Sequence, residues 1–504
     1  LRKKYKNKID DQITKADCAV VDEVANLYSK RFFERQAEIK DLIALKHKFD
    51  VDEYMMIDSD EIDWATSKKE LTDRWRKRVK FQHLSLKSTL DDKKVREKLK
   101  KRYELAKKRH NEIDAEDIYG IFLNAFSNAL DPHSSYYSPS SLEEFRIQTR
   151  LSLEGIGAVL RSEDGFTKIQ SLVKGGAAFK TGKVKVRDKI VAVAQGNDPP
   201  VDVIDMDLSE VVKKIRGKRG TTVKLSIVRE GNNGVQNLVV PIVREKVQLE
   251  DREAKAFTYE LKDEKTKKVA KVGVLSLPSF YMDFQGRQQG KKDYKSSSKD
   301  LLKELNRLTK EKVDAVVVDL RSNGGGSLDE AIRVAGLFIK KGPVVQIKAD
   351  GNQSYVQEDK DPTINYEGPL VVLTNVQSAS ASEIFAGAIK DHGRGLIVGD
   401  PATFGKGTVQ NLNDISSKLG AIKVTISKFY TPSGSSTQLK GVESDIIIPS
   451  MSAEYKIGER NYDYALPWEK INDAKRSDYG MVSNYLADLS KISKKRVGSD
   501  KDFQ

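Results

Sequence analysis

The sequence contains few of the residues that build disulfide bridges and metal centres. Its 504 residues include one cysteine, Cys18, which excludes an intrachain disulfide but does not decide the compartment. Five histidines are spread along the chain, and no two of them have the spacing of a metal site. We therefore expect no metal and no other cofactor. The histidines are His47, His83, His110, His133 and His392.

Long apolar runs and two common catalytic motifs are also missing. No stretch approaches the ~18 consecutive apolar residues of a membrane-spanning helix, so we expect no integral membrane span. There is no G-x-S-x-G motif, and His392 follows a predicted helix, where a positive charge is favourable in any case. Residues 399–407 resemble a phosphate-binding loop, but Gly407 replaces the magnesium-binding Ser or Thr. These absences argue against a Ser-His-Asp hydrolase and a nucleotide-binding protein.

The formal net charge of +14 raises the question of nucleic-acid binding. The lysines, however, are interleaved with acidic residues, as between residues 91 and 108. This pattern is typical of a solvated helix face rather than of a stripe that follows phosphates. We therefore expect no nucleic-acid partner.

The most informative stretch of the chain is residues 376–410. A cluster of small residues precedes a predicted helix at 381–390, and Lys406 follows on a turn between two glycines. A serine at a helix N-terminus lies near unpaired N–H groups that suit an oxyanion, and a buried lysine can act as its base. The alternative is a Ser/Ala-rich turn with an ordinary surface lysine.

Composition and periodicity divide the chain into four predicted regions. The first is mainly helical, with apolar residues at helical spacing in 19–46, 67–110 and 115–130. The second is rich in predicted strands, the third alternates strands and helices, and the fourth is polar and helical. Ser296 and Lys299 form an S-x-x-K pair, but they lie in a polar stretch that we interpret as a solvated linker. The regions are 1–145, 146–246, 247–450 and 451–504.

Several separated sequence blocks resemble the C-terminal processing peptidases, and most of all the tail-specific proteases of the bacterial periplasm. The resemblance runs in order from about residue 110 to 450. It implies a multidomain α/β protein with an N-terminal helical region, a PDZ domain and a serine protease core. The blocks are Leu130–His133, Leu151–Ala158, Asp319–Gly326, Ser378–Glu383, Thr403–Thr408, and Ser436–Gln438 with Gly441-Val442.

The resemblance also implies a role for individual residues. The middle serine of the cluster, Ser380, would be the nucleophile, with Lys406 as general base and Gln410 orienting the lysine. The N–H groups of Gly325 and Ala381 would form the oxyanion hole, and Asp391 would support the site. Ser380 and Lys406 are one residue further apart than in the family pattern, so Ser382 remains an alternative nucleophile.

The second region resembles a PDZ domain of the circularly permuted bacterial type. In such a domain Gly155, Ile156 and Gly157 would form the loop that binds a terminal carboxylate. The expected partners are protein or peptide substrates with apolar C-termini, with a lipoprotein adaptor as a further partner that the resemblance suggests. It also implies a periplasmic location after removal of a signal peptide. Two alternatives stay open: a β-barrel or sandwich without a ligand, and a PDZ-bearing scaffold with a degenerate protease core.

Overall fold

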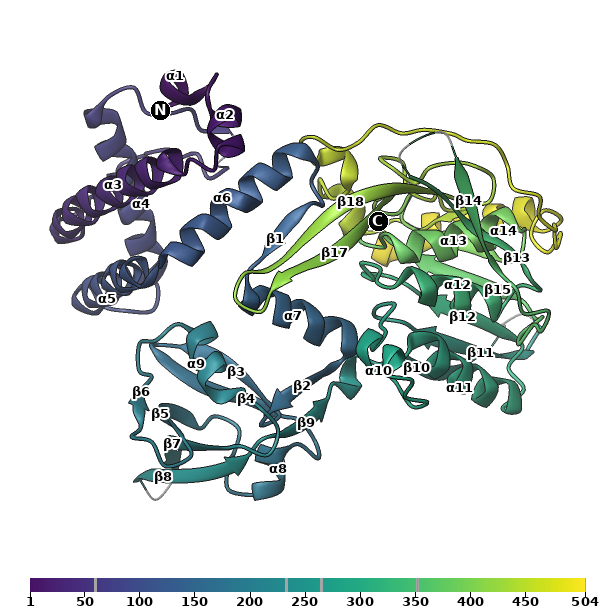
Figure 1. The fold of residues 1–504 in the computed structure, drawn as a ribbon, viewed down its shortest axis with the longest axis horizontal. Coiled ribbons are helices and arrows are strands. Elements are labelled where there is room, and N and C mark those ends of the chain that lie inside the picture. The colour runs from purple at the N-terminus through teal and green to yellow at the C-terminus, as the bar shows by residue number, and fades with distance from the viewer. Residues whose placement is uncertain (59–60, 232–233, 263–265, 350, 352, 504) are drawn as a thin grey trace. The chain divides into compact units, whose positions relative to one another are not determined.

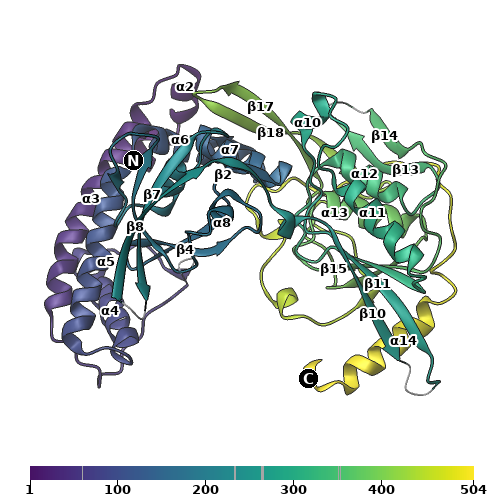
Figure 2. The same ribbon diagram turned by 90° about the horizontal axis from the view of Figure 1, so that it is seen from below.

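The fold is described from a computed structural model, which covers residues 1–58, 61–231, 234–262, 266–349, 351 and 353–503 (Figures 1 and 2). The chain divides into two compact units. The first comprises residues 1–122 with 205–207, and the second comprises 123–204 and 208–504.

The first unit is helical, as the apolar periodicity predicts. The predicted helix at 67–110 is in fact two helices, because Ser67 and Asp91 each cap a separate helix start. The helices are α1 (Arg2–Tyr5), α2 (Ile9–Thr14), α3 (Ala19–Ala44), α4 (Lys68–Lys87), α5 (Asp92–Glu112) and the first half of α6 (Ala115–Leu130). Helices α3, α4 and α5 share an apolar cluster, which consists of Ile39, Leu42, Ile43, Val79, Val95 and Leu99.

A PDZ-like β-domain follows the short strand β1 (Ser135–Tyr137) and helix α7 (Pro139–Arg150). Its main sheet has the order β3-β4-β5-β7-β8, with β6 on β5, while β2 pairs with β9. Alternate residues of β7 are buried, which is the period expected of a strand with one face on a core. The elements are β2 (Ser152–Gly155), β3 (Ala158–Glu163), β4 (Phe166–Leu172), α8 (Ala177–Thr181), β5 (Lys189–Gln195), β6 (Val201–Asp202), α9 (Leu208–Ile215), β7 (Thr222–Gly231), β8 (Gly234–Val243) and β9 (Glu245–Gln248).

The α/β core is built on a six-stranded sheet of order β10-β11-β12-β15-β16-β19, parallel except for the β10–β11 hairpin. Helices α11, α12 and α13 lie on one side of it in Figure 2. These helices and the buried strand residues share one apolar core. The elements are β10 (Lys255–Lys262), β11 (Val269–Ser276), α10 (Phe284–Gln288), α11 (Ser297–Lys310), β12 (Ala315–Asp319), α12 (Leu328–Gly336), β15 (Leu370–Thr374), α13 (Ala381–Asp391), β16 (Leu396–Gly399) and β19 (Ile446–Ile447).

A second sheet joins segments that are distant in the sequence. Strand β18 (Gly420–Tyr430) pairs with β17 (Thr408–Ser416), with β13 (Gly342–Lys348) and with β1, and β14 (Ser354–Asp359) pairs with β13. The register places Ser135 opposite Lys423, so a segment that precedes the PDZ-like domain lies beside the strands that follow Lys406. The C-terminal region contains η3 (Met451–Glu454), η4 (Glu459–Asn461), α14 (Leu486–Ser499) and η5 (Lys501–Phe503).

Candidate active site

Ser380 lies at the junction of strand β15, a tight turn and helix α13. It is the N-cap of α13 with φ 57° and ψ −111°, a conformation that costs energy for a residue other than glycine. The other two serines of the cluster, Ser378 and Ser382, are fully buried. Their hydroxyls donate to the carbonyls of Leu320 at 2.8 Å and Asn323 at 2.9 Å. Ser380 keeps partial exposure, so of these three serines it is the accessible one.

The carboxylate of Glu383, in the first turn of α13, links the serine turn to the lysine turn. Its Oε2 accepts the N–H groups of Ser380 at 2.7 Å and Lys406 at 3.0 Å. Its Oε1 accepts the Thr403 hydroxyl and the Gly405 N–H, both at 2.7 Å. Burial raises the pKa of Glu383 to about 7, while these four donors favour the ionised form. One buried carboxylate oxygen therefore fixes the backbones of Ser380 and Lys406 relative to each other.

Lys406 lies on the turn between β16 and β17, where Gly405 adopts φ +96°. Its Nζ donates to Gln410 Oε1 at 2.6 Å. Burial lowers the pKa of Lys406 to about 8, and the positive charge of Lys423 acts in the same direction. Close to a tenth of the amine is then neutral at pH 7, so this lysine can accept a proton.

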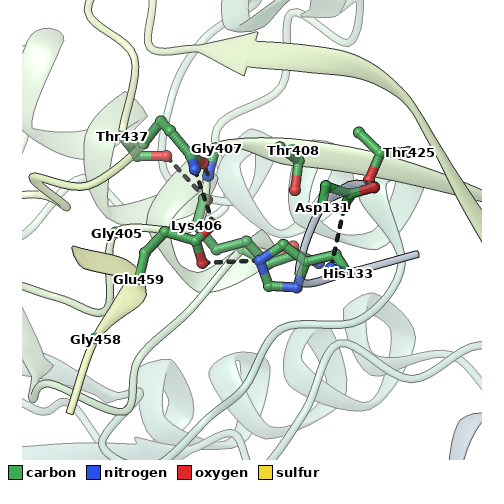
Figure 3. A network of polar contacts seen from close by, with 12 residues as sticks. Asp131, His133, Gly405, Lys406, Gly407, Thr408, Thr425, Thr437, Gly458 and Glu459 are labelled. Atoms are coloured by element: carbon green, nitrogen blue, oxygen red, sulfur yellow. Dashed lines mark hydrogen bonds and ion pairs between the residues drawn. The ribbon is translucent and has the colours of Figure 1, made fainter. Parts of the chain in front are cut away.

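A chain of hydrogen bonds leads from Gln410 to Asp131. The Gln410 Nε2 donates to the hydroxyls of Thr408 at 2.8 Å and Thr425 at 3.1 Å. The Thr425 hydroxyl donates to Asp131 Oδ1 at 2.7 Å (Figure 3). Asp131 is buried and also accepts the Ser134 hydroxyl at 2.5 Å.

A second buried carboxylate, Glu459, lies beside the lysine turn. Figure 3 shows His133 and Glu459 facing each other beside this turn, with 2.7 Å between His133 Nε2 and Glu459 Oε2. Glu459 Oε1 accepts from Gln438 Nε2 at 2.8 Å, and Gln438 Oε1 accepts the Gly407 N–H at 2.8 Å. The Glu459 N–H donates to the Phe404 carbonyl at 2.9 Å. The C-terminal region thus contacts the start of the lysine turn directly and its end through Gln438.

The glycine turn between β12 and α12 packs directly against the serine turn. A Cβ built on Gly325 would lie 2.8 Å from Ser380 Cβ and 3.0 Å from the Ala381 nitrogen, so no larger residue fits here. The backbone of Gly325 also has φ +103°, which favours glycine. Its N–H donates to Asn323 Oδ1 at 2.9 Å. Gly325 and Ala381 are therefore neighbours, with the Gly325 N–H engaged by Asn323.

Asp391 and His392 lie at the opposite end of α13 from Ser380. The Asp391 carboxylate accepts the Ser433 N–H at 2.6 Å and so holds the turn after β18. His392 is fully buried, with both ring nitrogens 2.9 Å from carbonyl oxygens, those of Ser477 and Pro343. His392 therefore has no nitrogen available for a serine.

The predicted carboxylate-binding loop joins β2 to β3 in the PDZ-like domain. Its carbonyls have internal partners: Ile156 accepts from the Ala178 N–H at 2.7 Å and Gly157 from the Val173 N–H at 2.9 Å. Gly157 has φ +74° and Gly155 pairs with Glu245 of β9. These contacts fix the loop backbone of residues 155–157 in one conformation.

The sequence interpretation of Ser296 as part of a solvated linker is wrong. Ser296 is 1% exposed and caps α11. Its hydroxyl donates to the buried carboxylate of Glu330 at 2.8 Å. A stretch that looked polar and solvated is therefore an internal helix start, because Glu330 supplies the acceptor.

Four polar residues of the site had no role in the sequence interpretation: Asp131, Glu383, Thr425 and Glu459. Asp131 and Glu383 lie in blocks that carry the family resemblance, which was the available signal. Thr425 and Glu459 gave no sequence signal. Among the described residues, no three His, Cys, Asp or Glu side chains are grouped as a metal site would require. In the same part of the chain, each helix is too short or too polar to cross a bilayer.

Comparison with known proteins gives four matches in order along the chain. Residues 1–140 match the tail-specific protease N-terminal domain and 144–228 match the PDZ domain. Residues 271–448 match peptidase family S41, and 453–504 match the C-terminal domain of tail-specific protease. The chain is 38% identical to the tail-specific protease of Haemophilus influenzae over 517 residues, covering 100% of this chain and 71% of the relative. The chain belongs to the tail-specific proteases of peptidase family S41.

Other carboxy-terminal processing proteases are similar to parts of the chain. A carboxy-terminal processing protease of Bacillus subtilis is 30% identical over 354 residues, covering 69% of this chain and 68% of the relative. Among solved structures, the photosystem II D1 C-terminal processing protease is 26% identical and covers 66% of this chain and 82% of its own, with a TM-score of 0.38. The PDZ domain of a carboxy-terminal protease from Vibrio cholerae, solved in complex with peptide, is 44% identical, covers 20% of this chain and 100% of its own, and has a TM-score of 0.19. The predicted fold, with a helical N-terminal region, a PDZ domain and a protease core, is confirmed.

Proposed function

We propose that this S41 peptidase is a serine endopeptidase with a Ser-Lys dyad, which captures the C-terminal tails of proteins and cleaves them nearby. The observation that carries the proposal is the environment of Lys406. Its amine donates to Gln410 Oε1, its pKa is about 8 because of burial, and its backbone shares Glu383 with Ser380. Such a lysine can act as a general base near neutral pH.

In the proposed reaction the Ser380 hydroxyl attacks the scissile carbonyl and its proton passes to the neutral Lys406 amine. The tetrahedral intermediate then expels the amine half of the substrate, which takes the proton from Lys406. Water next attacks the Ser380 ester, again with Lys406 as base, and the carboxylic acid product leaves. Gln410 holds the lysine amine through one N–H, so that the nitrogen lone pair is directed to the serine.

We propose the N–H groups of Ala381 and Gly325 as oxyanion donors. The Ala381 N–H belongs to the first turn of α13, where backbone donors and the helix dipole favour negative charge. The Gly325 N–H becomes available only when it turns away from Asn323 Oδ1. A bound substrate carbonyl would replace that side chain as acceptor, and Asp391 would support the far end of α13.

The PDZ domain is the proposed tail-binding part, with the terminal carboxylate on the N–H groups of residues 155–157. A match to a PDZ domain over 144–228 supports this assignment. We further propose a periplasmic location, a lipoprotein adaptor as an additional partner, and the domain boundaries 1–145, 146–246, 247–450 and 451–504. A scaffold that binds tails without hydrolysis is the second candidate, since a PDZ domain alone suffices for binding.

The test is cleavage of an unfolded protein that ends in an apolar tail. Wild type should cut it, and Ser380→Ala and Lys406→Ala should be inert although folded. Lys303→Ala removes an exposed lysine on α11 and serves as the control, with activity equal to wild type. Cleavage by Ser380→Ala would disprove the nucleophile assignment and make Ser382 the next candidate. Tail binding by wild type without cleavage would favour the scaffold.

A further inference from the structure

Asp131 is the residue from which the hydrogen bonds around Lys406 start. It lies in the turn before β1, and it accepts the Thr425 hydroxyl, the Ser134 hydroxyl, and the N–H groups of His133 and Ser134 at 3.0 and 3.1 Å. Burial alone would raise the pKa of Asp131, but the hydrogen bonds from Ser134 and Thr425 outweigh it and lower the pKa. Asp131 therefore stays ionised in the neutral range, and an ionised carboxylate can only accept hydrogen bonds.

An acceptor at one end fixes the direction of each following hydrogen bond. The Thr425 hydroxyl has a single proton, and because that proton goes to Asp131, the Thr425 oxygen can act toward Gln410 only as an acceptor. Gln410 must then present its NH₂ group to Thr425, and its carbonyl oxygen points the other way, to Lys406 Nζ. The two ends of an amide side chain have nearly the same shape, so sterics alone would not select this orientation.

We propose that Asp131 is a positioning residue of the protease reaction, which acts through Thr425 to hold the carbonyl oxygen of Gln410 against the Lys406 amine. The inference rests on the proposed Ser-Lys mechanism and deepens it. The orientation matters because a neutral amine has one lone pair. When Lys406 donates to Gln410, that lone pair is left for the serine proton.

The reverse orientation would inhibit the base. With an amide in place of the carboxylate, the side chain at 131 can donate to Thr425, and Thr425 can then donate to the Gln410 oxygen. Gln410 would turn its NH₂ group to Lys406 and occupy the lone pair that should receive the serine proton. A substitution of Asp131, which is 294 positions from Thr425 in the sequence, would thereby block the base.

The test compares variants of Thr425 and Asp131 in the full chain with the tailed substrate. Thr425→Val keeps the shape and removes the hydroxyl, and we expect kcat to fall about 10- to 100-fold with little change in KM. Thr425→Ser restores the hydroxyl and should restore kcat to near wild type. The double variant Thr425→Val/Gln410→Ala should be no slower than Gln410→Ala alone, because Thr425 acts only through Gln410. Thr258→Val is the matched control. Thr258 lies on the edge strand β10, and its hydroxyl also donates to a carboxylate, that of Glu311, at 2.8 Å.

Asp131→Asn gives a second readout, the position of the acidic limb and the height of the plateau in the kcat–pH profile. The charged groups that act on Lys406 are Lys423, which lowers its pKa, and Glu459, Glu383 and Asp131, which raise it. Removal of the Asp131 charge therefore moves the acidic limb of the kcat profile to lower pH, while kcat at the plateau falls. This measurement also serves if Thr425→Val folds poorly.

Each outcome decides between the proposals. Wild-type kcat in Thr425→Val, a double variant slower than Gln410→Ala, or an unmoved acidic limb in Asp131→Asn with full plateau activity would each overturn the role of Asp131. If Lys406→Ala still cleaves, the Ser-Lys mechanism itself is wrong. If Lys406→Ala is inert while the Thr425 and Asp131 variants are normal, only the positioning role fails.

Discussion

The pH dependence of cleavage follows directly from the environment of Lys406. With a pKa of about 8, the neutral fraction of this amine is about 0.1 at pH 7 and about 0.9 at pH 9. We therefore expect kcat to rise about tenfold between these two pH values and to level off above them. A lysine with the ordinary pKa of 10.5 would give roughly 300-fold less neutral amine at pH 7 and no plateau below pH 10.

The assay is cleavage of the tailed substrate at saturating concentration from pH 6 to 10, with peptide affinity measured at each pH as the control. Lys406→Arg should be inert across the range, because a guanidinium cannot be deprotonated in a protein. A profile that is flat from pH 6 to 9 would refute the lysine base.

Three further predictions concern stability and recognition. The folded pKa of Lys406 lies below its unfolded value of 10.5, so the unfolded chain binds more protons between about pH 8 and 10.5. Burial of the ammonium group therefore lowers the free energy of unfolding at low pH. This loss is recovered as pH rises through the window. Lys406→Met should therefore raise the free energy of unfolding by roughly 1–3 kcal/mol at pH 6 and by less at pH 10, and urea titrations at both pH values with equal gains would contradict this. Glu383→Gln places an NH₂ group against two buried N–H donors. We expect the free energy of unfolding, measured by denaturant titration, to fall by about 2–6 kcal/mol, and cleavage to be lost. Glu454→Gln, at an exposed position, is the control. Amidation of the substrate's terminal carboxylate should weaken peptide binding about tenfold or more. Cleavage of a short peptide without this tail should not change. Equal affinity for the free and the amidated tail would exclude carboxylate capture by the PDZ domain.

The local parts of the site were predictable from sequence. The small residues before residues 381–390 and the glycines on either side of Lys406 each specify a turn by short-range backbone preferences. The observed helix Ala381–Asp391 and the turn at Lys406 agree with those expectations. Spacing alone could not separate Ser380 from Ser382, because the carbonyl that accepts the Ser382 hydroxyl lies 59 positions away in the sequence.

The long-range parts were not predictable, because they depend on strand register. Thr425 reaches Asp131 because β18 pairs with β1, and a register one residue different would turn Thr425 to the opposite face. The pairing of Glu459 with His133 joins two residues that are 326 positions apart in the sequence. Nothing in composition or periodicity encodes such a contact. The same holds for Ser296, whose burial depends on Glu330 from a different helix.

The contacts of Glu459 determine when, during synthesis, the lysine turn can have all of its partners. Two partners of the lysine turn lie late in the sequence: Gln438 Oε1 accepts the Gly407 N–H, and the Glu459 N–H donates to the Phe404 carbonyl. During synthesis these residues emerge after Ser380, Lys406 and the whole PDZ domain. The PDZ domain is therefore complete in the growing chain before the lysine turn has all of these partners. The order of residues along the chain thus makes these contacts of the lysine turn among the last of the core that can form during synthesis.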